Sequence, residues 1–409
     1  MGRTALIDDV RAAHLAAAPW PYAELDVAAL RAAGHRPVPF REFVLKIHQR
    51  CNLACDYCYM YEHADQSWRE RPRTMSDEVR DATLARMATH ARDHDLPRVR
   101  IVLHGGEPLL YGTARLAEFV AQARATLPCP VDFSMQTNGV LLDERALAEL
   151  RPLGIRAGVS VDGTAAEHDR HRRTPGGRGS FAAVARALDL LRRPENRPLY
   201  GGLLCTVAAG TDPIACYEQL IAFEPPAIDL LLPHANWESP PPRPDGVATP
   251  YADWLTAVFD RWYADKSPIR IRLFDDAISL VLGGSGRSEQ LGLSPAGLVV
   301  IETDGAVEQV DALKSAYPGA CATGLNVLRD ELDDALDHPG IVARQIGRAA
   351  LSDECLACPA LAFCGGGHYA HRYRRDTGFR SPSVHCADLR VFVRHVYDRI
   401  AADLSGRQP

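Results

Sequence analysis

The 409-residue sequence predicts an α/β fold with a parallel sheet, followed by a smaller cysteine-rich region. Strand-like apolar runs alternate with helix-like runs six times between residues 42 and 233. Cys51, Cys55 and Cys58 directly follow the first of these runs. Four further cysteines gather between residues 355 and 386, where helix signals are weak. The chain is therefore expected to have one large domain and one smaller one.

Each predicted strand is short and rich in apolar residues, and the segments between strands show helical periodicity. The predicted strands are 42–48, 98–105, 131–139, 155–163, 201–207 and 227–233. The clearest helical segments are 77–91, 114–127, 143–153 and 181–193. Strands joined through helices run parallel, and chemistry in such folds gathers at their carboxyl ends.

The remaining segments divide the chain into four expected parts. A proline-rich break at 236–250 precedes a helical stretch at roughly 251–282. A hairpin is predicted at 298–314, turning at Asp304-Gly305, and an amphipathic helix at 388–404 closes the chain. We therefore expect an N-terminal arm (1–40), a parallel-sheet domain (41–235), a helical linker (236–297) and a cysteine-rich domain (298–409).

Composition excludes several classes of protein. The net charge of −6 provides no basic surface for nucleic acid, and no apolar run is long enough to span a membrane. The N-terminus lacks a secretory signal pattern. Eleven cysteines in spaced groups favour metal sites in a reducing compartment. We expect a cytoplasmic protein that binds neither nucleic acid nor membranes.

The spacing C-x3-C-x2-C at Cys51, Cys55 and Cys58 is the most informative motif. Three thiolates can hold three irons of a [4Fe-4S] cluster and leave the fourth iron open. An open position on a metal is typical of a catalytic site. Its natural occupant is S-adenosylmethionine (SAM), bound through its amino and carboxylate groups. The alternative is a zinc knuckle with His48 or His63 as the fourth ligand.

The motif and its surroundings resemble radical SAM enzymes, including the aromatic Tyr57 before the third cysteine. The resemblance extends from about residue 20 to about 395 and implies a partial (β/α)6 TIM-like barrel with a C-terminal SPASM-like iron–sulfur domain. Four segments resemble the FxsB-type peptide maturases, which are associated with three-residue cyclophane crosslinks. They are WPYAELD (20–26), RPVPFREFVLKIH (36–48), CDYCYMYEHADQSW (55–68) and CGGGHYAHRY (364–373).

The resemblance places a SAM site at the ends of the second, third and fourth strands. Gly105 and Gly106 would let the backbone approach SAM, and Glu107 would accept a hydrogen bond from its ammonium group. Asn138 would face the SAM ribose. Ser160 and Arg172 match family residues that contact SAM, with Arg172 pairing with the SAM carboxylate. An Asx turn between Asp162 and Gly163 is an equal alternative to a functional role for Asp162.

Cys355, Cys358, Cys364 and Cys386 supply four thiolates for a closed auxiliary [4Fe-4S] cluster, with a four-cysteine zinc site as the alternative. SPASM domains usually carry seven cysteines and two auxiliary clusters. Here His368 stands at their shared position and Val310 at another, so we expect one auxiliary cluster, although Cys321 lies near. The remaining Cys129, Cys205 and Cys216 are expected to be packing thiols.

The resemblance implies chemistry on a precursor peptide. A 5′-deoxyadenosyl radical would take hydrogen from a side-chain β-carbon, and the carbon radical would attack an aromatic ring of the same peptide. The ring must then lose an electron, for which the auxiliary cluster is a sink, and a proton. Asp311 is the expected base, because a related sulfatase-maturing group has a catalytic aspartate at that position. A flavodoxin- or ferredoxin-like protein would be the reductant.

Two other functions are compatible with the same residues. One is another oxidative modification, such as thioether or formylglycine formation. The other is a non-catalytic iron–sulfur electron carrier or peptide-binding scaffold. An electron carrier would have no need of the SAM contacts Glu107 and Ser160.

Overall fold

The computed structural model describes residues 18–265 and 269–406. Ten strands of this part form a single sheet in the order β10-β9-β8-β1-β2-β3-β4-β5-β6-β7. Strands β1 to β6 pair in parallel, as the sequence predicts, and β7 adds a further parallel strand beside β6. Their bounds are β1 Glu42–His48, β2 Val99–Gly105, β3 Val131–Thr137, β4 Arg156–Ser160, β5 Tyr200–Thr206, β6 Ala227–Leu231, β7 Arg270–Ile271, β8 Leu298–Ile301, β9 Ala306–Glu308 and β10 Ala322–Asn326.

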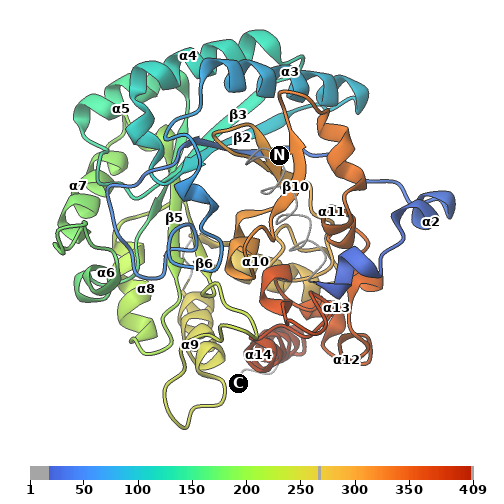
Figure 1. The fold of residues 1–409 in the computed structure, drawn as a ribbon. Helices are drawn as coiled ribbons and strands as arrows, with labels where there is room; N and C mark the ends of the chain where they lie inside the picture. The colour runs from blue at the N-terminus through green and yellow to red at the C-terminus, as the bar shows by residue number, and fades with distance from the viewer. Residues whose placement is uncertain (1–17, 266–268, 407–409) are drawn as a thin grey trace.

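Six helices between successive strands form an arc around the outside of the sheet (Figure 1). They are α3 Asp77–Asp93, α4 Thr113–Thr126, α5 Glu144–Leu150, α6 Ala165–His171, α7 Phe181–Arg192 and α8 Pro213–Ala222. Several begin at a side chain that caps the first turn: the Ser76 hydroxyl accepts a hydrogen bond from the Val79 amide, and Thr164 forms a capping box with Glu167.

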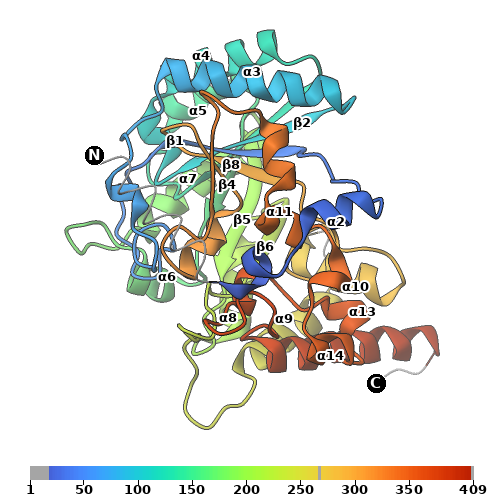
Figure 2. The ribbon, with the colours of Figure 1, turned by 45° about the vertical axis from the view of Figure 1, so that its right-hand side comes forward.

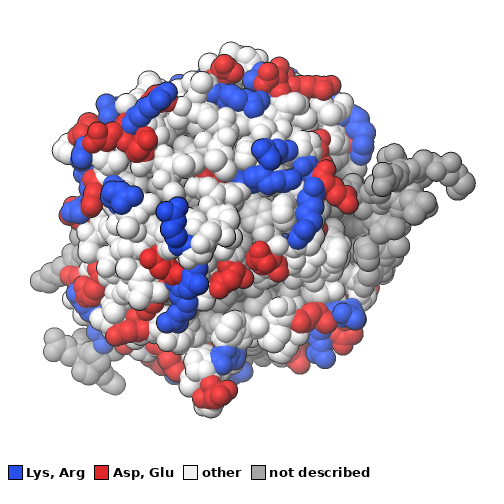
Figure 3. Space-filling view, turned by 60° about the vertical axis from the view of Figure 1, so that its left-hand side comes forward, with Lys and Arg blue, Asp and Glu red and all other residues white. Residues whose placement is uncertain are grey.

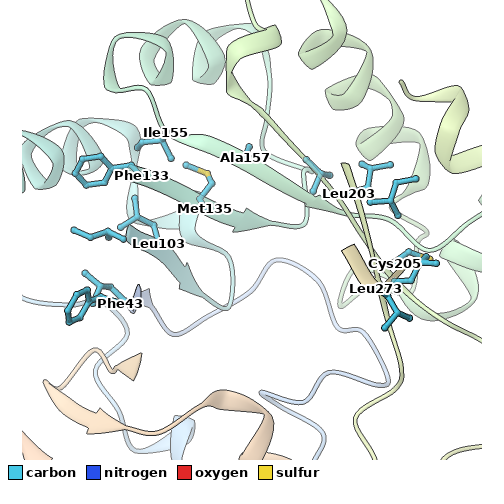
Figure 4. Close-up of a cluster of buried hydrophobic side chains, with 14 of the residues drawn as sticks. Phe43, Leu103, Phe133, Met135, Ile155, Ala157, Leu203, Cys205 and Leu273 are labelled. Atoms are coloured by element: carbon cyan, nitrogen blue, oxygen red, sulfur yellow. The ribbon is translucent and has the colours of Figure 1, made fainter. Parts of the chain in front are cut away.

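Side chains alternate between the two faces of the strands, because successive residues of a strand point to opposite sides. Figure 4 shows apolar residues of neighbouring strands, including Phe43, Leu103 and Phe133, gathered in one cluster. The intervening positions of the same strands include polar side chains that contact one another: Lys46 Nζ lies 2.9 Å from His104 Nδ1. The sheet therefore has an apolar face under the helices and a face with polar groups inside the partial barrel.

The C-terminal part of the chain joins the barrel through β1. Residues Glu42 to Leu45 pair in parallel with Leu298 to Ile301 of β8. The predicted hairpin is confirmed, because β8 and β9 are antiparallel and Gly305 at the turn has a φ of +82°. Glycine adopts this left-handed conformation at little steric cost. The four domain boundaries stay a prediction, although this pairing makes one continuous sheet of residues from two of the proposed parts.

The predicted helical stretch at roughly 251–282 consists of two helices with a short strand between them. The chain forms α9 (Pro250–Ala264), then β7, then α10 (Arg272–Val281). The Trp262 indole donates a hydrogen bond of 3.0 Å to the carbonyl of Ile269, and β7 pairs with β6. The sequence signal for the break is Pro268, because proline is unfavourable inside a helix.

The C-terminal region packs on α9 and α10. Its helices are α11 Pro339–Ala343, α12 Asp353–Leu356, α13 Leu361–Cys364 and α14 Cys386–Leu404, and the last confirms the predicted closing helix. Of the predicted N-terminal arm, residues 1–17 lie outside the described part, and the rest contains α2 (Val27–Ala32). Helix α2 lies beside this region in Figures 1 and 2, where Arg31 forms a 2.5 Å ion pair with Asp337.

The described helices include none long and apolar enough to cross a membrane. On the face shown in Figure 3, Lys and Arg side chains are interspersed with Asp and Glu side chains.

Candidate active site

The first cysteine group lies in the loop after β1, where the sequence places it. Cys51, Cys55 and Cys58 are free, half-buried thiols. The loop is held from two sides: the Ala54 amide donates to the carbonyl of Arg173 at 2.7 Å, and the Asn138 side-chain amide donates to Cys51 Sγ at 3.5 Å. Burial raises the pKa of Cys51 and of Cys55 to about 11. Three thiols are thus brought together at the carboxyl end of the sheet with no disulfide among them.

Gly105 and Gly106 bring the end of β2 against the start of the cysteine loop. A Cβ atom on Gly105 would lie 2.1 Å from the carbonyl oxygen of His48, and one on Gly106 would lie 2.4 Å from that of Arg50. The Gly106 and Glu107 amides donate to these same two carbonyls. The glycines are therefore required by the close approach of two backbone segments, a reason that the sequence analysis did not give.

Glu107 is fully buried and held by three neutral donors. Its carboxylate accepts hydrogen bonds from the Thr137 hydroxyl at 2.7 Å, the backbone amide of Asn138 at 2.8 Å and the backbone amide of Leu109 at 3.1 Å. Burial raises the pKa of Glu107, and these donors oppose that rise. A carboxylate offers about four lone-pair positions, so one remains for a further donor. An ammonium group there would stabilise the buried charge.

Tyr57, Asp162 and Arg172 form a polar cluster beside Cys55. The Tyr57 hydroxyl donates to Asp162 Oδ2 and accepts from Arg172 Nη1 at 2.7 Å. Asp162 Oδ1 accepts from the amide of Thr206 at 3.1 Å. Asp162 thus links the loop to β5, and its side-chain bonds are not those of an Asx turn with Gly163.

Two further observations complete the site. Arg172 Nε is buried and has no hydrogen-bond partner among the described residues. Ser160 ends β4 and accepts a hydrogen bond of 2.9 Å from the Gln136 side chain. The loop, the ends of β2 to β4 and the end of α6 therefore bring together thiols, carboxylates, hydroxyls and a guanidinium.

Comparison with known proteins shows what this group of side chains is similar to. Residues 45–195 match the family described as the radical SAM superfamily. These residues are similar to a radical SAM domain. The match contains the first cysteine group and all the expected SAM contacts, and it favours the [4Fe-4S] and SAM reading over a zinc knuckle.

Relatives of the radical SAM domain extend the comparison. The chain is 34% identical over 180 residues to a serine-type anaerobic sulfatase-maturating enzyme of Klebsiella aerogenes, which covers 42% of this chain and 43% of that protein. The chain thus spans less than half the length of that relative. It is 24% identical over 368 residues to a cysteine-type anaerobic sulfatase-maturating enzyme of Clostridium perfringens, covering 86% and 94% of the two chains.

A solved structure has the same fold. It is described as native anSMEcpe with bound AdoMet and Cp18Cys peptide, and it matches with a TM-score of 0.76 at 21% identity. The match covers 89% of this chain and 99% of the other. The predicted fold class, an α/β partial barrel followed by a cysteine-rich C-terminal region, is thereby confirmed. The narrower FxsB-type resemblance stays a prediction.

The residues present fit the groups that a radical SAM domain holds. Cys51, Cys55 and Cys58 would hold three irons of the cluster. The free lone pair of Glu107 suits the SAM ammonium, and the unpartnered Nε of Arg172 suits its carboxylate. Tyr57 and Asp162 position Arg172, and Asn138 holds Cys51.

The second cysteine group also comes together. Cys355, Cys358, Cys364 and Cys386 all line one cavity of about 280 Å³. Three successive left-handed glycines at 365–367 turn the chain sharply after Cys364. The Arg372 guanidinium donates to the Gly365 carbonyl at 3.0 Å and to the Gly367 carbonyl at 2.6 Å. The arrangement suits a closed four-thiolate auxiliary [4Fe-4S] cluster.

Four cysteines lie outside both cysteine groups, and so does His368, which stands where SPASM domains usually have a cysteine. Cys321 is buried beside Glu308 and Lys314, outside the 280 Å³ cavity. His368 packs against His371 with ring centroids 5.0 Å apart. Cys205 and Cys216 are buried, with sulfurs 3.9 Å apart, and pack as expected. Cys129 is a half-buried free thiol.

Anaerobically reconstituted protein should contain about eight irons per chain, because two ligand sets hold four each. Replacing Cys355 and Cys386 with alanine should lower the count to about four, while Cys321→Ala should leave it unchanged. Iron and sulfide analysis with Mössbauer spectroscopy measures this. About twelve irons would contradict a single auxiliary cluster, and about four irons with one zinc would assign the second group to zinc.

Asp311 begins the short helix η6 (Asp311–Ser315) and lies inside the barrel, next to the cysteine loop. It forms a buried ion pair with Lys46 of β1, and Lys46 Nζ also lies 3.5 Å from Met60 Sδ, two residues after Cys58. Asp311 Oδ1 is buried without a hydrogen-bond partner among the described residues. Burial opposes ionisation of Asp311, but Lys46, His104 and Lys314 together outweigh it and hold the pKa of this carboxyl below its usual 3.8.

A larger ion network surrounds this pair. Lys314 Nζ binds Glu302 at 3.1 Å and Glu308 at 2.9 Å, and Arg71 contacts the same two carboxylates. Neither the network nor Lys46 was predicted from the sequence. The available signal was a lysine between the apolar residues Leu45 and Ile47 of the strand EFVLKIH (42–48).

Proposed function

We propose that this chain is a radical SAM peptide maturase that forms a cyclophane, a C–C crosslink between an aromatic ring and a side-chain β-carbon of one precursor peptide. The observation that carries the proposal is a cavity of about 700 Å³ beside the cysteine loop. Asp56, Glu62 and His63 line it from the segment 55–68, and Tyr373 from the segment 364–373. Two of the four segments that resemble FxsB-type maturases therefore meet at a cavity large enough for peptide side chains.

When bound, the cluster and SAM supply a 5′-deoxyadenosyl radical, which can take hydrogen from an unactivated C–H bond. Glu107 and Arg172 would fix the ammonium and carboxylate of SAM by charge-assisted bonds. Tyr57 and Asp162 keep Arg172 in place, and the buried surroundings exclude water.

Asp311 is the proposed base for the proton that leaves the aromatic ring. Its Oδ1 is free to accept that proton, while Lys46 keeps Oδ2 paired and the group ionised. Helix η6 connects this carboxylate with the cavity, because it begins at Asp311 and ends at Ser315, which lines the cavity.

The ratio of crosslinked peptide to 5′-deoxyadenosine should stay constant between about pH 6 and pH 8, because Asp311 has a lowered pKa and is ionised throughout that range. Burial lowers the pKa of His234 to about 3 and of His368 to about 4, so these neighbouring imidazoles stay neutral there. The ratio is measured by chromatography and mass spectrometry. A ratio that falls with a midpoint near pH 6.5 would assign the proton transfer to a histidine.

Co-expression with the short open reading frame beside the gene, followed by mass spectrometry, tests the proposal. A cyclophane lowers the peptide mass by two hydrogens per crosslink and suppresses fragmentation within one aromatic-bearing segment. The product should not react with a hydrazide, since it carries no aldehyde. A flavodoxin- or ferredoxin-like reductant is the proposed electron donor in this assay.

Formylglycine formation is the second candidate, because the two relatives described above are named sulfatase-maturating enzymes. A formylglycine made from serine also lacks two hydrogens, but it reacts with a hydrazide and leaves fragmentation intact. A hydrazide-reactive product would replace the cyclophane proposal. Failure to form 5′-deoxyadenosine with any peptide would instead contradict the proposed enzyme activity.

A further inference from the structure

One face of α3 contacts a C-terminal segment through three side chains spaced four residues apart. None of these side chains belongs to a cysteine group. Arg86 contacts Glu331 and donates to the Val327 carbonyl at 3.2 Å. His90 and His94, one and two turns further along, both contact Asp333 of the short helix η7 (Leu332–Asp337). Residues at i and i+4 of a helix lie on the same face, so both imidazoles reach one carboxylate.

The contacts of His90 indicate that Nε2 carries the ring hydrogen and that Nδ1, without one, faces a carboxylate. Nε2 lies 3.1 Å from the Phe40 carbonyl oxygen, which can only accept a hydrogen bond, so Nε2 carries the hydrogen. Nδ1 faces Asp333 Oδ1. In a neutral imidazole whose hydrogen is on Nε2, Nδ1 has a lone pair. Nδ1 and Asp333 Oδ1 are then both acceptors, and only a cation between them can join them.

His94 repeats the arrangement on the other carboxylate oxygen. Its Nε2 lies 2.9 Å from Asp333 Oδ2. The ligand atoms of the three residues all lie within 4.8 Å of one another. Two imidazoles therefore converge on a single carboxylate, which can balance one positive charge.

We propose that His90, His94 and Asp333 bind a divalent transition-metal ion of the zinc class, which ties α3 to the C-terminal segment 327–337. Two imidazole nitrogens and a carboxylate oxygen are a ligand set that zinc accepts, with water as the fourth ligand. The contact of His90 Nε2 with the Phe40 carbonyl is the outer hydrogen bond that metal-binding histidines make.

The burial of His90 and the lowered pKa of its imidazole favour a metal ion, and not a proton, as the cation between His90 and Asp333. The His90 side chain is 1% exposed, and burial lowers its pKa even though Asp333 acts in the opposite direction. The neutral imidazole, which has the free lone pair, is therefore the favoured form near pH 7. The His94 and Asp333 side chains are 23% and 42% exposed, so an ion and its water ligand can enter from solvent.

The site is independent of the clusters, because it contains no cysteine and rests on α3 and η7. Two other groups among the described residues differ from it. Glu302, Glu308 and Asp311 also lie close together, but Lys46, Lys314 and Arg71 already balance their charge. The His395–Asp260 pair, at 2.8 Å, has one imidazole only.

The test measures zinc uptake by cluster-loaded protein. Wild type, His94→Ala, Asp333→Asn and the matched control His395→Ala are dialysed against Zn²⁺ at several concentrations, and bound zinc and iron are determined by elemental analysis. Wild type and His395→Ala should retain one more zinc per chain than the other two variants. Loss of one ligand should weaken binding by at least about tenfold. His94 and Asp333 are partly exposed, so both variants should fold, and thermal unfolding in EDTA checks this.

Zinc should also raise the unfolding temperature of wild type and His395→Ala but not of the two site variants, because a ligand that binds only the folded state stabilises it. Equal zinc uptake by all four proteins, or an equal loss in His395→Ala, would overturn the proposal. So would a wild type whose unfolding temperature is unaffected by zinc.

Discussion

Replacing Cys51, Cys55 and Cys58 together with alanine should abolish formation of 5′-deoxyadenosine. The three thiols are brought together after β1, and they are the proposed ligands of the catalytic cluster. Enzymes accelerate reactions by at least about 10⁶-fold, so loss of the cofactor should reduce the rate by more than about a thousandfold. Chromatography of reactions with dithionite and SAM measures the product.

The matched control is Cys129→Ala, which removes a half-buried thiol outside both cysteine groups. It should keep the parent rate and iron content, while the triple variant should lose about four irons per chain. A triple variant that produces 5′-deoxyadenosine at the parent rate would contradict the assignment of these ligands.

Asp311→Asn should separate the two halves of the reaction. The variant should still cleave SAM, because the first hydrogen abstraction needs no base. It should form about a hundredfold less crosslinked peptide, since an amide cannot take up the ring proton and a positioned base contributes at least that factor. Mass spectrometry of the peptide and chromatography of 5′-deoxyadenosine, on the same samples, give the two yields.

The ion pair with Lys46 requires a stability control. Removing one partner of a buried pair can destabilise a protein by about 3–5 kcal/mol, because the other charge stays buried. Asp304→Asn is the matched variant: Asp304 lies at the turn of the hairpin that precedes η6, is one-third exposed, and lies 3.6 Å from Arg71. It should crosslink normally. If Asp311→Asn crosslinks at the parent rate, or loses SAM cleavage while folded, Asp311 is not the base.

The sequence predicted the barrel strands well because each is a short apolar run followed by a turn. All six begin within one residue of their predicted starts and end within three residues of their predicted ends. Strand β7 was missed because it has two residues, too few for any periodicity. The pairing of β8 with β1 was also missed, since a contact between distant segments leaves no local pattern.

The candidate site shows the same division. The two cysteine groups could be found from their spacing in the sequence, and the structure brings the members of each group together. Asp162 was not, because its partners are the Tyr57 hydroxyl and the Thr206 amide, which come from other elements. The Lys46–Asp311 ion pair could not be predicted for the same reason, because it joins β1 to η6, two elements far apart in the sequence.

The pairing of β1 with β8 also bears on how the protein is made. Leu45 pairs with Ile301, which leaves the ribosome more than 250 residues later. At about 5–20 residues per second, the β8 side of β1 stays unpaired for roughly 13–50 s during synthesis. The cysteine loop is attached to this strand, so its final geometry forms only after most of the chain has emerged. We expect iron–sulfur assembly factors to act on the nearly complete polypeptide and not on its first domain.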